Sequence, residues 1–150
     1  MATSSPDEPK RSNTNVRDIT SKGGLSRTFI SDQAKEFRSK YNIKNSSTLP
    51  TRSYQKNLIV EEFKEFIEAE GMLFRHGRNL HEECLKELAD LVYVCYQYAE
   101  NMGWFLDEAL DRVHKSNMSK LGEDGKPIYR EDGKVLKGPN YKPPNLEDLF

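Results

Sequence analysis

Cysteine is scarce in this 150-residue sequence, which contains only Cys84 and Cys95. On one helix, their spacing of eleven positions would separate them by about 16 Å, which is too far for a disulfide. We therefore expect two buried, reduced thiols, and we expect the protein to reside in a reducing compartment such as the cytoplasm.

Long apolar runs and an excess of basic residues are also missing. No segment is apolar over the length that would span a membrane, and no apolar signal-peptide core lies near Met1. The formal net charge is -1, whereas a nucleic-acid binder would show a dominant basic surface. These absences argue against membrane and nucleic-acid partners.

The charges that are present are segregated along the chain. Residues 53–111 carry five Lys or Arg against thirteen Asp or Glu, whereas residues 112–142 carry eight against four. An acidic region followed by a basic one suits a metal site whose phosphate-binding residues come from another part of the chain.

Residues 1–28 contain few large apolar side chains and are rich in Ser, Thr, Asn, Lys and Arg. Burial of so little apolar surface cannot offset the entropy of ordering them, so we predict a disordered tail. A transit peptide is the alternative for this segment, and Asp7, Glu8 and Asp18 count against it. One folded domain is then expected over residues 29–150.

Apolar residues at helical spacing predict four helices, over about residues 31–40, 52–70, 81–102 and from 107 onward. Ser31 and Asp107 are the expected N-caps of the first and last helices, and Gly71 is expected to end the second. The loop before the third helix is short, which makes its two flanking helices antiparallel neighbours. The predicted fold is therefore all-α, an antiparallel bundle with a four-helix core. The loop residue His76 has no partner at fixed spacing, and a solvated side chain is the simpler interpretation.

The C-terminal part of the sequence predicts a β-hairpin followed by an extended tail. Two Asp-Gly pairs are turn signals, and short apolar pairs face each other across the second of them. Gly138 and three prolines keep the end of the chain extended, so we expect it to lie over the helices or over a partner subunit.

Two pairs of acidic residues have the spacing that places both members of a pair on one helix face, namely Glu62 with Glu65 and Glu87 with Asp90. Each pair borders an apolar stripe, so the carboxylates are expected to point inward. Isolated buried carboxylates are costly and would either protonate or need cations. Ordinary solvated glutamates are the alternative for any single pair, but two such pairs favour a site for Mg²⁺, or for Mn²⁺ in its place.

The apolar stripe of the fourth helix continues into two polar residues, Asn117 and Lys120. A lysine and an amide in this position are placed to bind the phosphates of a ligand near the acidic residues. The alternative is a lysine at the end of a helix that only complements the helix dipole.

The third helix is apolar on nearly every side between Leu88 and Ala99. A domain of this size has too few helices to cover such a segment, and an exposed strip would be larger than soluble monomers usually tolerate. We therefore predict a homo-oligomer, a homodimer or a homotetramer.

Three motifs together resemble a known family: Glu-Glu-x-x-Glu at residues 61–65, Glu-x-x-Asp at 87–90 and SNMSK at 116–120. They resemble the all-α nucleotide pyrophosphohydrolase superfamily, in particular its MazG-like branch. The stretch over residues 113–146 looks like the C-terminal part of small members labelled phosphoribosyl-ATP pyrophosphohydrolase-like. The resemblance runs from about Ser31 to the C-terminus, and the first 30 residues have no counterpart in it.

The resemblance implies roles for individual residues. Glu62, Glu65, Glu87 and Asp90 would hold the metal, and Glu61 would orient or deprotonate the attacking water. The residues that would bind the triphosphate are Asn117 and Lys120, helped by Arg112 and Lys115.

The function that follows from the resemblance is Mg²⁺-dependent cleavage of a (d)NTP into (d)NMP and pyrophosphate, which would control the nucleotide pool. Two alternatives stay open at this point. One is phosphoribosyl-ATP pyrophosphohydrolase, and the other is a non-catalytic helical oligomerisation module whose acidic residues are solvated.

Overall fold

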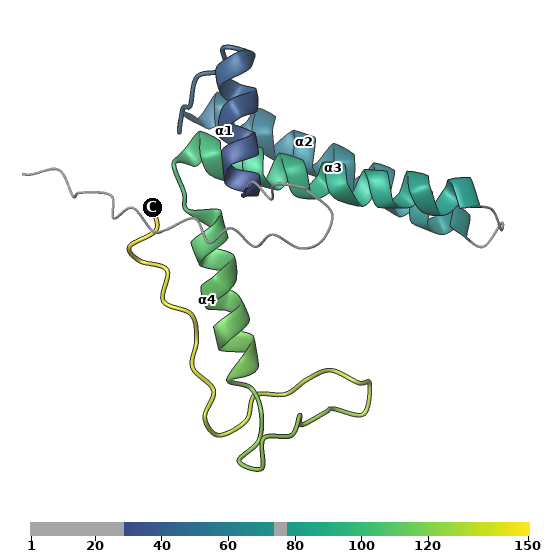
Figure 1. The fold of residues 1–150 in the computed structure, drawn as a ribbon, viewed down its shortest axis with the longest axis vertical. Coiled ribbons are helices and arrows are strands. Elements are labelled where there is room, and N and C mark those ends of the chain that lie inside the picture. The colour runs from purple at the N-terminus through teal and green to yellow at the C-terminus, as the bar shows by residue number, and fades with distance from the viewer. Residues whose placement is uncertain (1–28, 74–77) are drawn as a thin grey trace, which may run out of the picture.

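The computed structural model describes residues 29–73 and 78–150. These residues form four helices and no strand, which confirms the all-α prediction. The helices are α1 (Ile30–Lys40), α2 (Leu49–Met72), α3 (Arg78–Met102) and α4 (Leu106–Met118) (Figure 1). None of the helices in these two ranges is long and apolar enough to cross a membrane. The tail over residues 1–28 and the loop residue His76 lie outside the described residues.

Three residues do not have the roles at helix ends that were predicted for them, and α2 and α3 begin a few residues earlier than expected. Ser31 and Asp107 are not N-caps, because Phe29 and Phe105 occupy those positions. Instead, the Ser31 hydroxyl donates a hydrogen bond to Asp107, which joins the first turns of α1 and α4. Gly71 does not end α2, which continues to Met72. Both expected caps therefore serve a tertiary contact that sequence periodicity does not reveal.

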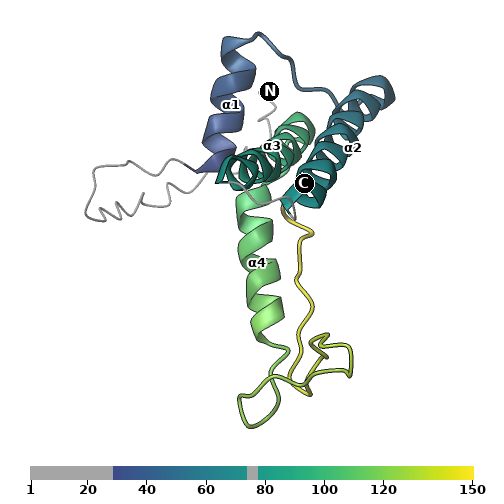
Figure 2. The same ribbon diagram turned by 90° about the vertical axis from the view of Figure 1, so that its right-hand side faces the viewer.

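The helices α2 and α3 form the predicted antiparallel hairpin, and α1 packs across α3 (Figures 1 and 2). Arg38 of α1 is only 3% exposed and fixes this crossing. Its guanidinium donates hydrogen bonds to Asn101 Oδ1 at 2.9 Å and to Asn45 Oδ1 at 2.6 Å. Burial lowers the pKa of Arg38, partly offset by the charge of Glu100. A buried arginine with these partners ties α1 and the loop after it to the C-terminal half of α3.

The predicted four-helix core does not form within one chain. Gly103 has a φ of 73°, a left-handed conformation that favours glycine, and it ends α3 with a sharp change of direction. Beyond this turn α4 packs against α1 and points away from the α2–α3 hairpin (Figures 1 and 2). The bundle of a single chain therefore contains three helices, and α4 projects from it.

Residues 119–150, here called the C-terminal arm, turn at the far end of α4 and run back along it (Figure 2). The predicted β-hairpin is reduced to one isolated bridge between Tyr129 and Val135. Both of these side chains are exposed, at 60% and 43%, so no packing stabilises longer strands. The extended course predicted for the end of the chain is present in the arm.

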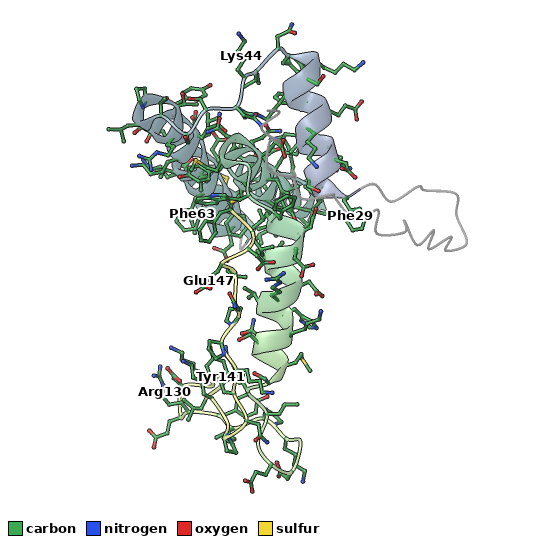
Figure 3. The ribbon with its side chains drawn as sticks, turned by 90° about the vertical axis from the view of Figure 1, so that its left-hand side faces the viewer. Phe29, Lys44, Phe63, Arg130, Tyr141 and Glu147 are labelled. Atoms are coloured by element: carbon green, nitrogen blue, oxygen red, sulfur yellow. The ribbon has the colours of Figure 1, made fainter. Side chains whose placement is uncertain are left out.

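Hydrogen bonds attach the arm to α4 along its length. The Ser116 hydroxyl donates to the Lys142 carbonyl at 2.7 Å, and the Phe105 amide donates to the Leu149 carbonyl at 3.1 Å. Between these two points Arg112 donates to both carboxylate oxygens of Asp148, at 2.5 and 2.9 Å. Figure 3 shows the returning part of the arm, with Tyr141 toward the far end of α4 and Glu147 closer to the hairpin.

The core of the single chain is small. None of the large side chains in the described residues is fully buried, and the buried apolar residues are Ala34, Ala69, Cys84, Tyr96, Ala99 and Leu149. Both cysteines are free thiols, and burial raises the pKa of the Cys95 thiol. Large apolar side chains remain exposed on α2, α3 and α4, for example Phe63, Leu88 and Leu110.

Candidate metal centre

Three carboxylates from the two helices of the hairpin come together near the middle of α2. One carboxylate oxygen from each of Glu62, Glu87 and Asp90 lies within 4.8 Å of the other two. All three side chains are half-buried. We call these three residues the carboxylate cluster.

The helical phase of the acidic residues produces this cluster. Glu87 and Asp90 are three residues apart on α3, so both side chains lie on one face of the helix. Antiparallel packing of α2 on α3 places Glu62 opposite that face. The prediction that members of the two acidic pairs face each other is realised for these three residues.

The electrostatics of the cluster disfavour three bare carboxylates. Burial is the main cause that raises the pKa of Glu62, and the negative charges of Glu65, Asp90, Glu87 and Glu61 raise it further. Each of these neighbours makes ionisation of Glu62 harder. A cation placed among these groups would offset both the cost of burying charged carboxylates and the repulsion between them.

One oxygen of the cluster also lacks a partner. Glu87 Oε2 is buried and accepts no hydrogen bond from the described residues. Leaving such an acceptor unpaired away from water costs free energy. A hard divalent ion takes oxygen ligands of this type, so the residues present fit a Mg²⁺ or Mn²⁺ ion.

The other two predicted acidic residues lie at the edge of the cluster. Glu61 and Glu65 are exposed and line an open groove of about 490 Å³ on the side of α2. Glu65 remains close enough to the cluster to be the strongest of the charges that raise the pKa of Glu62. The remaining residues that line the groove are Asn57, Val60, Lys64 and Glu68.

A family model described as phosphoribosyl-ATP pyrophosphohydrolase matches residues 23–117, which is more than half of the chain. The chain belongs to this family. The family lies within the MazG-like all-α nucleotide pyrophosphohydrolases, so the resemblance carried by the motifs is confirmed. No curated protein matches the sequence.

Membership in the phosphoribosyl-ATP pyrophosphohydrolase family makes the chain a hydrolase of phosphoric anhydride bonds. Its substrate class is a nucleotide with such a bond. The family is typically metal-dependent, which agrees with the acidic cluster of Glu62, Glu87 and Asp90.

The residues predicted to bind phosphate lie on α4 and at the start of the arm. Arg112 is engaged by Glu108 and Asp148, and Lys115 pairs with Asp111 at 2.6 Å. Asn117 is exposed at the last turn of α4, the end that points away from the hairpin (Figure 1). Lys120 follows in the arm, three residues beyond the end of the family match. Within one chain the structure does not bring these residues to the carboxylate cluster.

Sequence reasoning missed one residue at the cluster, Lys86. Its ammonium contacts Glu87 Oε1 at 2.9 Å and Asp90 Oδ2 at 2.8 Å. The spacing of four residues between Lys86 and Asp90 is a signal for a helical ion pair, and it was available in the sequence. The contact between Arg38 and Asn101 has no such signal, because these two residues lie far apart in the chain.

Proposed function

We propose that this pyrophosphohydrolase cleaves a nucleoside triphosphate or deoxynucleoside triphosphate between its α and β phosphates. The products would be the nucleoside monophosphate and pyrophosphate. The observation that carries the proposal is the convergence of Glu62, Glu87 and Asp90 from two helices, together with the unpaired oxygen Glu87 Oε2. Glu65 completes the proposed set of metal-binding residues from the edge of the cluster, and Mg²⁺ is the proposed ion.

When bound, a divalent ion of this kind supplies positive charge to phosphate oxygens and lowers the pKa of a coordinated water. The residues of the chain would bind the ion and position the water. Glu62, Glu87 and Asp90 hold negative charge at one point between two rigid helices. Glu61, exposed beside Glu62, is proposed to orient the attacking water or to accept its proton.

Asn117 and Lys120, helped by Arg112 and Lys115, are proposed to bind the phosphate chain. In one chain α4 carries these residues away from the hairpin, so the proposal requires α4 and the arm of a second copy (Figure 1). A complex of two inactive variants tests this sharing of residues. If Asp90→Asn and Lys120→Ala proteins regain activity when they are mixed and refolded together, the two residues act across a subunit boundary. If the two variants stay inactive after they are refolded together, the site is not shared between subunits.

The exposed apolar surface supports a homo-oligomer, a dimer or a tetramer. On α3, Leu85 is 67% exposed and Leu88 and Val92 are each about 40% exposed, although a soluble monomer usually covers such side chains. Symmetric packing of this surface against a second copy would enlarge the small core. Sedimentation equilibrium at micromolar concentration is the direct test, and an active monomer of 17.3 kDa would contradict the proposal.

A second candidate substrate is phosphoribosyl-ATP, which the description of the matching family favours. It carries the same triphosphate group, so the carboxylate cluster would serve either reaction. Kinetics with a panel of NTPs, dNTPs and phosphoribosyl-ATP separates the candidates. The compound with the highest kcat/KM identifies the substrate class.

The proposed reaction is tested by pyrophosphate release from the purified full chain, with Mg²⁺ and with a chelator. We expect release that depends on the metal. A folded protein without turnover of any compound in the panel would favour the remaining alternative, a helical oligomerisation module.

A further inference from the structure

The ammonium group of Lys86 lies between two oxygens of the carboxylate cluster. Its Nζ atom is 2.8 Å from Asp90 Oδ2 and 2.9 Å from Glu87 Oε1. The side chain of Lys86 is 64% exposed, whereas Glu87 is 12% exposed. A flexible, solvent-facing cation is therefore attached to two of the three residues that would hold the metal.

We infer that Lys86 is a built-in counter-cation, which occupies the oxygens of Glu87 and Asp90 when no metal is bound and leaves them when a divalent ion arrives. The inference rests on the proposed metal-binding role of these carboxylates, and it goes beyond that role by naming a residue that competes with the ion.

Geometry supports competition rather than shared occupation. Mg²⁺ approaches its oxygen ligands to 2.0–2.1 Å, which would bring a double positive charge close to the ammonium that contacts the same two groups. Two cations so close repel each other, and the four-carbon stem of lysine lets its ammonium move to solvent at little cost. A lysine ammonium is charged at neutral pH, and this one contacts both carboxylates.

The same contacts explain how the metal-free hairpin tolerates its acidic residues. Lys86 neutralises part of the charge that Glu87 and Asp90 direct at Glu62. Glu87 Oε2 still has no partner among the described residues, so the ammonium does not replace every contact that an ion would make. Lys86 is thus a weaker substitute for the ion.

The test compares the wild-type chain with Lys86→Met, which keeps the apolar stem and removes the charge. Binding of Mn²⁺ is measured by electron paramagnetic resonance of the free ion. Because the two ion pairs of the exposed Lys86 side chain oppose the metal, we expect Lys86→Met to bind Mn²⁺ about threefold to tenfold more tightly. Lys86→Arg restores the cation and should return the affinity toward that of the wild type.

Lys64→Met is the matched control. Lys64 lies on α2 two residues after Glu62, and within the described residues it forms no ion pair. Its loss changes the net charge near the cluster by the same amount without removing a contact to Glu87 or Asp90. Equal tightening in both methionine variants would mean a general charge effect, and it would overturn the inference.

Thermal melting provides a second readout. Lys86→Met should lower the Tm of the metal-free protein, and the deficit should vanish in saturating Mn²⁺. A deficit of the same size with and without metal would make Lys86 an ordinary surface ion pair.

The result for the wild type distinguishes failure of the proposed metal site from failure of the proposed role of Lys86. A wild-type chain that binds no Mn²⁺ overturns the proposed metal site and the role of Lys86 together. A wild-type chain that binds Mn²⁺ with the same affinity as Lys86→Met leaves the metal site intact and overturns only the role of Lys86.

Discussion

The α2–α3 hairpin and the C-terminal arm are held in place by different interactions. In the hairpin, two long helices pack against each other along their length, and that packing fixes the positions of the acidic side chains. The arm has no helix or strand, and separate hydrogen bonds to α4 hold it. The acidic residues thus lie on the hairpin, where many contacts together hold the helices in position. Lys120 lies on the arm, whose contacts can be removed one at a time.

The largest expected effect belongs to the hairpin. Asp90→Asn or Glu62→Gln should abolish turnover, because each removes a carboxylate from the proposed metal site. The protein should stay folded, and the metal-free Glu62→Gln variant should melt at the same or a higher temperature, since burial and repulsion act against the ionised Glu62. Steady-state kinetics measures the turnover, and circular dichroism measures the fold and the melting temperature. Near-normal activity in both variants would contradict the assignment of the metal site.

The next effect concerns the arm. A Cβ atom on Gly138 would lie 2.2 Å from the Leu121 carbonyl oxygen, and the clashing atoms belong to the backbone. Gly138→Ala should therefore force residue 138 away from Lys120 and Leu121 at the start of the arm, with a cost of about 1–3 kcal/mol. Hydrogen exchange should show faster exchange of the Gly138 amide, which donates to the Lys120 carbonyl at 2.9 Å.

Gly71→Ala is the control for that substitution. Gly71 is exposed near the end of α2, and a Cβ atom there meets nothing within 4 Å. We expect an unchanged or slightly raised Tm, because alanine favours a helix more than glycine does. If the Tm of Gly138→Ala is also unchanged or raised, the close approach of Gly138 to Lys120 and Leu121 does not hold the arm in place.

Lys120 tests whether the arm has a chemical role. Lys120→Ala should lower kcat/KM on the order of tenfold or more, through the loss of a charge-assisted contact to phosphate. Stability should change little, because the Lys120 carbonyl still accepts from Gly138. Lys126→Ala, which removes an exposed lysine of the same arm, is the control. Unchanged kinetics with a lowered Tm would mean that Lys120 supports only the fold.

The smallest effect is a pH dependence of the arm. The Arg112 guanidinium holds the pKa of the Asp148 carboxyl below its usual value. A carboxyl with a lowered pKa in the docked arm stabilises docking at pH values above its undocked pKa. This stabilisation is lost as the pH falls from the ordinary pKa of an aspartate through the lowered pKa of Asp148.

Asp148→Asn should imitate this loss at neutral pH, and hydrogen exchange at the Phe105 amide reports it. Because the Asp148 side chain is 65% exposed and water screens the pair, the change should be modest. An exchange rate that responds to neither the substitution nor acid would show that the contact does not hold the arm.

The sequence was informative where local periodicity decides the structure. The spacing of Glu87 and Asp90 placed both on one face of a helix, and the short loop made α2 and α3 antiparallel, so the facing of Glu62 could be predicted. The prediction that Lys120 lies near these acids extended an apolar stripe along α4, but a stripe gives the face of a helix and not its direction in space. That direction depends on the turn at Gly103 and on the Ser31–Asp107 contact.

The failed β-hairpin has a similar explanation. The Asp-Gly turn forms, since Gly133 has a φ of 83° and the Leu136 amide donates to the Ile128 carbonyl at 2.7 Å. Turn signals fix this local geometry, whereas strands need a surface to pack against, and the sequence does not show that the arm leaves the helices. Leu88 and Val92 of α3 stay exposed in the single chain, as expected from the small number of helices available to cover this apolar helix.

The hydrogen bond between the Phe105 amide and the Leu149 carbonyl closes a long loop that contains α4 and the whole arm. In polymer terms, the entropic cost of closing a loop grows only with the logarithm of its length. A few residues inserted at the exposed Asp124–Gly125 turn would therefore change this cost very little. The same insertion directly beside Lys120 or Gly138 would instead shift the two backbones that the hydrogen bond from the Gly138 amide to the Lys120 carbonyl joins. This turn is thus a suitable point at which to introduce a spectroscopic label or a small domain without disturbing the hairpin.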